Sequence, residues 1–121
     1  MKLMIKDVLE AAPILKKITD FSLPAKAAYN IMRNMKKIEH GIKPFEEDRL
    51  KLVYKYGKES ETGKVSVAEE NMENFYKDVA SLLDGEIEVD IRQIKIDQLE
   101  EVKLTPNEIQ CIEFMLEKDP E

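Results

Sequence analysis

The chain contains few of the residues from which catalytic and metal sites are built. Its 121 residues include one cysteine, one histidine, four glycines and no tryptophan. The single cysteine, Cys111, excludes a disulfide within the chain, and the single histidine, His40, has no second ligand at metal-binding spacing. The scattered glycines form no phosphate-binding loop. Adjacent carboxylates such as Glu46 and Glu47 point apart on a helix and favour a solvated surface. We therefore expect no enzyme, no metal and no cofactor.

Long apolar runs are also missing. No stretch approaches the ~20 consecutive apolar residues that cross a bilayer. The N-terminal segment carries lysines and acids within its apolar pattern, unlike a secretory signal. Together with the single cysteine, these features predict a cytoplasmic protein without a membrane partner.

Charge, by contrast, is abundant and unevenly distributed over what the length predicts to be a single domain, residues 1–121. Residues 1–43 contain nine Lys or Arg and four Asp or Glu, a balance of +5. Residues 44–121 contain ten and 21, a balance of −11, which makes the net charge −6. Either the two halves neutralise each other, or the basic half presents an anion-binding surface. The overall acidity argues against nucleic acid as the partner.

The clearest pattern is a heptad repeat that begins at Ala28. Apolar residues recur at alternating steps of three and four, which keeps one stripe of a helix facing another helix. We predict one long helix over 24–56, kinked near 40–44 by Gly41 and Pro44. This stripe is either core or a seam for an oligomer or partner, formed by Ile31, Met35, Ile38, Ile42 and Phe45.

A shorter helix is expected before the long one, near residues 8–19. Asp7 and Glu10 have the spacing of a capping box at its start. Pro13 lies inside this span, so the helix is expected either to split there or to restart with Pro13 in its first turn.

After the long helix, residues 56–66 predict the turn of a helical hairpin, because glycines and polar residues gather there. Ser66 and Glu69 predict the cap of a third helix over 67–83. The apolar face of this helix would pack against the C-terminal half of the long helix.

The C-terminal part predicts a strand followed by a capped helix. Ile87, Val89 and Ile91 alternate as in a half-buried strand, which must pair either with residues 2–5 or with a second chain. Thr105 is the expected cap of the last helix. The fold is therefore predicted to be mainly α with a small β element (α+β), comprising a helical hairpin over 8–83 and a strand–helix module over 86–117.

Two features favour binding. The first is a set of basic residues on the long helix, away from its apolar seam, which we expect either to bind an anion or acidic partner or to form a solvated face. The set comprises Lys26, Arg33, Lys36 and Lys37. The second is the methionine-rich stretch around Tyr29, Met32 and Met35, which would be an adaptable binding groove if exposed and core if not.

Three segments resemble a family of small phage and prophage proteins of low-GC Gram-positive bacteria: "LPAKAAYNIMRNMKKIE", "FEEDRLKLVYKYG" and "EIEVDIRQIKIDQLEEVKLTPNEIQCIEFML". They cover about half the chain. The resemblance implies a phage or prophage origin and the cytoplasm of a host bacterium, and it assigns no site residues. The chain departs from the family pattern at Gly41 and Pro44, where an uninterrupted helix is expected.

These observations lead to one hypothesis and one alternative. The first is a non-enzymatic, homo-oligomeric binding protein of the counter-defence or host-takeover type. It would block a host protein or sequester a small anionic nucleotide signal. The alternative is an accessory, scaffold or chaperone protein of virion assembly that uses the heptad helix as its contact surface.

Overall fold

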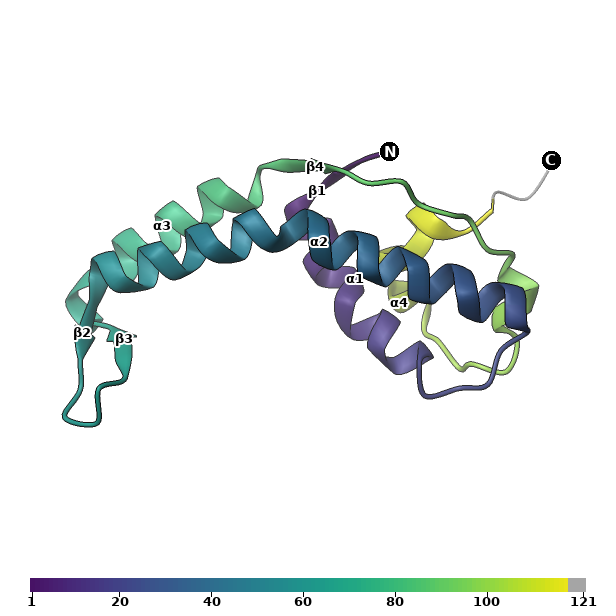
Figure 1. The fold of residues 1–121 in the computed structure, drawn as a ribbon, viewed down its shortest axis with the longest axis horizontal. Coiled ribbons are helices and arrows are strands. Elements are labelled where there is room, and N and C mark those ends of the chain that lie inside the picture. Colours follow the sequence, from purple (N-terminus) through teal and green to yellow (C-terminus); the bar gives the residue numbers. More distant parts are fainter. Residues whose placement is uncertain (118–121) are drawn as a thin grey trace.

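A single long helix, α2, runs the length of the molecule and joins two parts (Figure 1). The computed structural model describes residues 1–117. We call residues 1–45 and 85–117 the body and residues 46–84 the arm. The elements in chain order are β1 (Lys2–Met4), α1 (Ile5–Ile18), α2 (Ala25–Tyr56), β2 (Gly57–Glu59), β3 (Val65–Val67), the 3-10 turn η1 (Glu69–Asn71), α3 (Met72–Leu83), β4 (Glu86–Glu88), η2 (Ile96–Leu99), α4 (Pro106–Ile112) and η3 (Glu113–Met115).

The hydrophobic core lies in the body. One face of α1 packs against one face of α2, and the C-terminal segments close the far side, which confirms the mainly α fold with a small β element. Burial of apolar surface on this scale is the main stabilising term of a small domain. The fully or nearly fully buried core residues include Val8, Ala11, Leu15, Ile18, Ile31, Ile94, Ile112 and Met115.

The C-terminal module contains the predicted cap, and its predicted strand is shorter than the alternation of Ile87, Val89 and Ile91 indicated, because β4 (Glu86–Glu88) ends before Val89. Strand β4 pairs antiparallel with β1, with Leu3 opposite Ile87, so the strand finds its partner at the N-terminus of the same chain. The Thr105 hydroxyl accepts a hydrogen bond from the Glu108 backbone N–H, and the Glu108 carboxylate accepts one from the Thr105 N–H. This reciprocal capping box fixes the start of α4.

Helix α2 spans Ala25–Tyr56 without interruption, close to the predicted 24–56. Pro44 lies inside it and removes one backbone hydrogen bond, to the His40 carbonyl. Figure 1 shows the helix changing direction near its middle. Within residues 1–117, no helix combines the length and the apolar character needed to cross a membrane.

Helix α1 differs from the prediction at both its start and its proline. It begins at Ile5, directly after β1, and its N-cap position is Met4 without a side-chain cap, so Asp7 and Glu10 do not form the expected box. The Ile5 N–H instead donates to the Gly85 carbonyl at 2.9 Å, because β1 is held beside β4. Pro13 neither splits nor restarts the helix: it is exposed, and tertiary packing of the opposite face outweighs its cost.

The arm also differs from the prediction. The expected turn over 56–66 contains a β-hairpin, β2–β3, and Ser66 belongs to β3 rather than to a helix cap. Gly63, at φ +82°, makes the tight turn between the strands. The third helix, α3, therefore begins at Met72 instead of 67, and Phe75 is its one buried residue. The hairpin was missed because each of its strands is only three residues long.

Candidate functional site

The heptad seam lies against the interior of the chain. Ile31, Ile38, Ile42 and Phe45 are buried and Met35 is half-buried, all within the single chain. The seam thus contributes to the core of the body, with Met35 only half-buried, and the mainly exposed side of α2 is its opposite, outward face.

A basic and aromatic face occupies the outward side of the N-terminal half of α2. Tyr29 is 52% exposed and Met32 is 45% exposed, although both are large and mainly apolar. They surround a shallow depression of about 420 Å³ together with Arg33, Lys36, Lys37 and His40. Three of the four predicted basic residues are therefore gathered at one place, while Lys26 lies outside this depression, near the start of the helix.

Arg33, on this face, is held in place by an ion pair. Its Nη2 donates to Asp90 Oδ2 at 3.2 Å, and this ion pair joins α2 to the segment after β4. Its Nη1 is buried and has no hydrogen-bond partner within residues 1–117. A buried donor without a partner costs free energy, so the ion pair with Asp90 holds Arg33 in place at some cost to stability.

Arg92 extends the basic face from a distant part of the sequence. Its guanidinium lies 5.8 Å from the centre of the Tyr29 ring, within the range of a cation–π contact. The buried Asn34 side chain holds the Arg92 backbone against α2 through two hydrogen bonds. Sequence reasoning missed Arg92 because its contact with Tyr29 depends on this long-range bridge. The one local signal is that the apolar alternation of Ile87, Val89 and Ile91 resumes at Ile94 in the opposite phase, which indicates a bend near Arg92.

An apolar groove of about 410 Å³ adjoins the basic face. Phe21 and Leu23, from the turn between α1 and α2, form one wall, and Met32 and Met35 form the other. Lys36 lines both the groove and the basic depression. The methionine-rich stretch is therefore partly exposed, and methionine side chains adapt readily to different apolar ligands.

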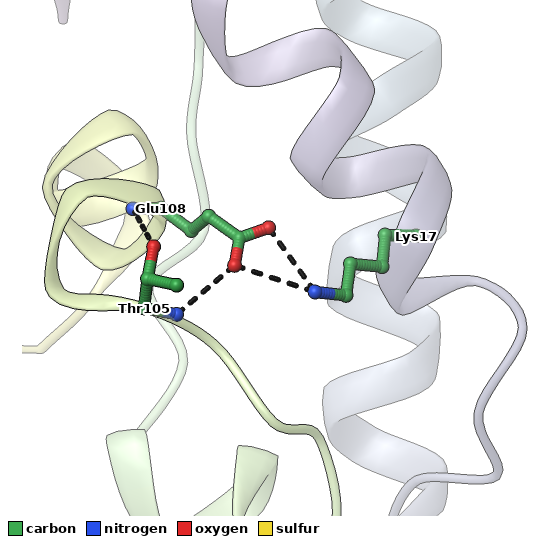
Figure 2. Close-up of polar contacts among 3 residues, drawn as sticks. All are labelled: Lys17, Thr105 and Glu108. Atoms are coloured by element: carbon green, nitrogen blue, oxygen red, sulfur yellow. Dashed lines mark hydrogen bonds and ion pairs between the residues drawn. The ribbon is translucent and has the colours of Figure 1, made fainter.

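The two halves of opposite charge are joined by a few ion pairs, and one of them stabilises the capped helix α4. Figure 2 shows Lys17 of α1 donating to both carboxylate oxygens of Glu108, at 3.3 and 3.2 Å. The Thr105 N–H and, to a lesser extent, the Lys17 ammonium hold the pKa of Glu108 below its ordinary value. The halves thus neutralise each other in part.

Most lysines of the basic set are not neutralised by these ion pairs. Within residues 1–117, Lys26, Lys36 and Lys37 form no ion pair. In the same range no group of three or more His, Cys, Asp or Glu is placed to hold a metal ion. The chemistry that the described side chains offer at this face is attraction of negative charge beside an apolar surface.

The residues that this face brings together are Arg33, Lys36, Lys37 and Arg92, together with Tyr29 and Met32. Comparison of the chain with protein-family models, with curated proteins and with solved structures gives no match.

Proposed function

We propose that this protein is a non-enzymatic binding protein that engages an acidic host protein. It does so through the basic face of α2 and the adjoining apolar groove. The observation that carries the proposal is the juxtaposition of unpaired cations with exposed apolar side chains, here Lys36 and Lys37 with Tyr29 and Met32. Clusters of exposed apolar residues bordered by charge are typical of protein-binding surfaces.

An acidic protein segment fits this surface better than a small anion does. A small-anion site needs donors that converge within an enclosed pocket. Here the cations lie along an open helix face from Lys26 to Lys37, a distance of about 17 Å at 1.5 Å per residue. An acidic amphipathic helix would place carboxylates along this row and apolar side chains in the groove beside Met35.

The biological setting of the proposal comes from the sequence. The resemblance to phage and prophage proteins supports an action on a component of the infected bacterium, as counter-defence or host takeover. A binding protein without catalytic groups would act there by occupying a surface that the host protein needs.

A second candidate function is supported by the arm. Leu50, Tyr54 and Tyr76 are large, partly or wholly apolar and exposed on it. An arm that carries such residues suits a scaffold or chaperone that contacts other virion proteins during assembly.

The test of the first candidate is capture of host proteins by matched charge variants. We would compare the unchanged protein, Lys36→Glu/Lys37→Glu and the control Lys64→Glu/Lys77→Glu, which makes the same charge change on the arm. Captured proteins would be quantified by mass spectrometry, and direct binding would then be measured with the purified acidic candidate.

The proposal predicts an acidic host protein that binds the unchanged protein and the control and loses at least about tenfold in affinity for Lys36→Glu/Lys37→Glu. Equal affinity of all three proteins would contradict it. Release of a nucleotide from the unchanged protein on denaturation, with no protein partner, would replace it with anion sequestration.

A further inference from the structure

The arm carries an acidic amphipathic helix whose charge is opposite to that of the basic face. Residues 69–84, which comprise η1, α3 and the C-cap of α3, contain five Asp or Glu and one lysine, a balance of −4. Within residues 1–117, three of these acids, Glu69, Glu73 and Asp84, form no ion pair. All three are exposed, so their charge is directed away from the arm.

An apolar stripe on α3 is only partly covered. Four of its residues follow one another at steps of four, three and four, the spacing of a stripe that faces another helix. They are Met72, Tyr76, Val79 and Leu83. Tyr76 is 62% exposed and the other three are half-buried. Phe75, the one buried residue of α3, lies about 100° from Tyr76, so the stripe flanks the packed side of the helix.

On α2, the exposed Tyr29 separates an apolar row from a basic row. Met32 lies about 60° from Tyr29 in one direction around the helix, on the wall of the apolar groove. Lys26 and Lys37 lie about 60–80° from Tyr29 in the other direction, and both are exposed. This part of α2 precedes the change of direction near its middle, so the two rows follow a straight segment (Figure 1).

On α3, the exposed Tyr76 separates an apolar row from an acidic row in the same rotational sense. Val79 lies three residues after Tyr76, as Met32 lies after Tyr29. Glu73 lies three residues before Tyr76 and Asp84 eight residues after it, the offsets that the two lysines have from Tyr29. Two helices with this shared arrangement bring apolar rows together, and acids against lysines, only when they run antiparallel. A parallel partner places its apolar row opposite the charges.

One antiparallel register satisfies both charged rows at once. Lys26 and Lys37 are eleven residues apart, about three helical turns, and so are Glu73 and Asp84. When Lys37 lies level with the partner's Glu73, the other lysine therefore lies level with the partner's Asp84. Two lysines without an ion pair in residues 1–117 then meet two equally unpaired acids.

The same register also accommodates the neighbouring side chains. Met35, which lines the apolar groove, is within one residue of the level of the partner's Tyr76. Arg33 contributes no free charge, because it pairs with Asp90. The partner's Lys77, the single base of its segment, lies level with that pair, where the Asp90 side chain is still 72% exposed.

We infer that copies of this chain associate head to tail, with α3 of one copy antiparallel to the N-terminal half of α2 of the next. The α3 of the same chain cannot occupy this face, because it packs along the other half of α2, where the Tyr56 hydroxyl donates to Asp78 (Figure 1). Since α3 is antiparallel to its own α2, the α2 helices of successive copies run parallel and are displaced along their axes. Such a heterologous contact does not close into a two-fold dimer and can repeat.

The first experiment reverses one charged row at a time and measures mass in solution. Light scattering over a range of concentrations would follow the unchanged protein, Lys26→Glu/Lys37→Glu, Glu73→Lys/Asp84→Lys and an equal mixture of the two variants. Circular dichroism would verify folding. We expect the unchanged protein to grow beyond a dimer, each variant to lose at least about tenfold in association constant, and the mixture to regain it. A monomer at every concentration, growth that stops at a dimer, or a mixture no larger than the separate variants would overturn the inference.

The second experiment tests the orientation. In a Cys111→Ala background, Lys37→Cys/Glu73→Cys would be oxidised and compared with Lys26→Cys/Glu73→Cys, the pair that a parallel arrangement brings together. We expect the first pair to give a ladder of disulfide-linked dimers, trimers and larger species, and the second to give at least about tenfold less. Equal or stronger cross-linking of the second pair would exclude the antiparallel arrangement.

The association goes beyond the proposed function but uses the same basic face, so an acidic host helix would compete with α3 of the neighbouring copy. Glu73→Lys/Asp84→Lys separates the two, because it leaves the basic face unchanged and its capture of host proteins reports on that face alone. Capture with an unchanged protein that stays monomeric would overturn the association and leave the proposed function standing. Association without capture of an acidic host protein would do the reverse.

Discussion

The Asn34 side chain binds both polar groups of the Arg92 backbone. Its Nδ2 donates to the Arg92 carbonyl at 2.8 Å, and its Oδ1 accepts from the Arg92 N–H at 2.9 Å. Asn34 is fully buried, and its two bonds resemble those that a neighbouring strand would make. The residue therefore fixes the segment after β4 against α2 and places Arg92 above Tyr29.

We expect Asn34→Ala to destabilise the protein by about 2–3 kcal/mol, because the Arg92 N–H and carbonyl lose their partners in a partly buried place. Thermal or urea unfolding measures this cost. Asn30→Ala, one turn earlier on the same helix, is the control and should cost less. Equal losses from the two variants would show that the bridge to Arg92 contributes no more than ordinary packing.

The lowered pKa of Glu108 predicts that the contribution of this carboxylate to the stability of the folded protein depends on pH. Its pKa is lowered in the folded protein, first by the Thr105 N–H and then by Lys17, from an ordinary value of 4.5. A lowered folded pKa means that the contribution is present above the unfolded pKa and is lost as pH falls through the folded pKa. The difference in stability between the unchanged protein and Glu108→Gln should therefore be constant near neutral pH and shrink below about pH 4.5.

Unfolding of both proteins between pH 3 and pH 7 measures this difference. Thr105→Ala serves as the comparison, because it removes the hydroxyl of the cap but keeps the backbone N–H that is the main cause of the lowered Glu108 pKa, so it should cost about 1 kcal/mol with a weaker dependence on pH. A Glu108→Gln difference that does not change with pH would exclude the charge of Glu108 as its origin.

The close packing around Gly41, in the middle of α2, predicts that a larger side chain at this position destabilises the protein. A Cβ at this position would lie 3.2 Å from Ile87 Cδ1 and 3.4 Å from Val89 Cγ2. Gly41→Leu should therefore push the β4 segment away from α2 and cost about 2 kcal/mol in unfolding experiments. His40→Leu, on the neighbouring exposed position, should be near neutral, and equal costs would contradict the close approach.

The arm should unfold locally before the body does. Phe75 is the one buried residue of α3, and the buried residues of α2 end at Phe45. Because local stability follows the number of buried apolar contacts, amide hydrogens of residues 46–84 should exchange faster than those of α1. Hydrogen exchange followed by mass spectrometry measures this directly.

Phe75→Ala sharpens that prediction. The loss of the ring should cost the arm about 3 kcal/mol and raise exchange in α3, while exchange in α1 stays the same. Equal acceleration in α1 and α3 would show that the body and the arm unfold as one unit.

The sequence predicts the elements whose signal is local and misses those that depend on distant partners. The heptad stripe of α2 and the Thr105 cap are recognisable within a few residues, and both are confirmed. The prediction that α1 starts near residue 8 was wrong, because the strand pairing of β1 with β4 outweighs the local capping pattern of Asp7. The sequence also marked Gly41 as a weak point, whereas the structure places it where a Cβ would lie only 3.2 Å from Ile87 Cδ1, so the absence of a side chain lets the β4 segment approach α2 closely.

In the candidate site too, the sequence predicts the local arrangement and misses the contacts with distant residues. The helical spacing predicts that Arg33 and Lys37 share a face, and the structure gathers them. The spacing could not predict that Asp90 pairs with Arg33, or that Arg92 joins the face, because both residues arrive through a bridge from a different part of the chain. The sequence also leaves open which apolar stripe of α2 lies inward.

The arm is an insertion whose two ends join the body at neighbouring positions. The chain leaves the body after Phe45 and returns at Gly85, and both residues line the same recess beside Ile5. A short turn between these points would close the body without rerouting β4 or α4. The arm could therefore be lengthened, shortened or exchanged while the body keeps its sheet, its core and its basic face, so the size of the protein and its recognition surface can vary independently.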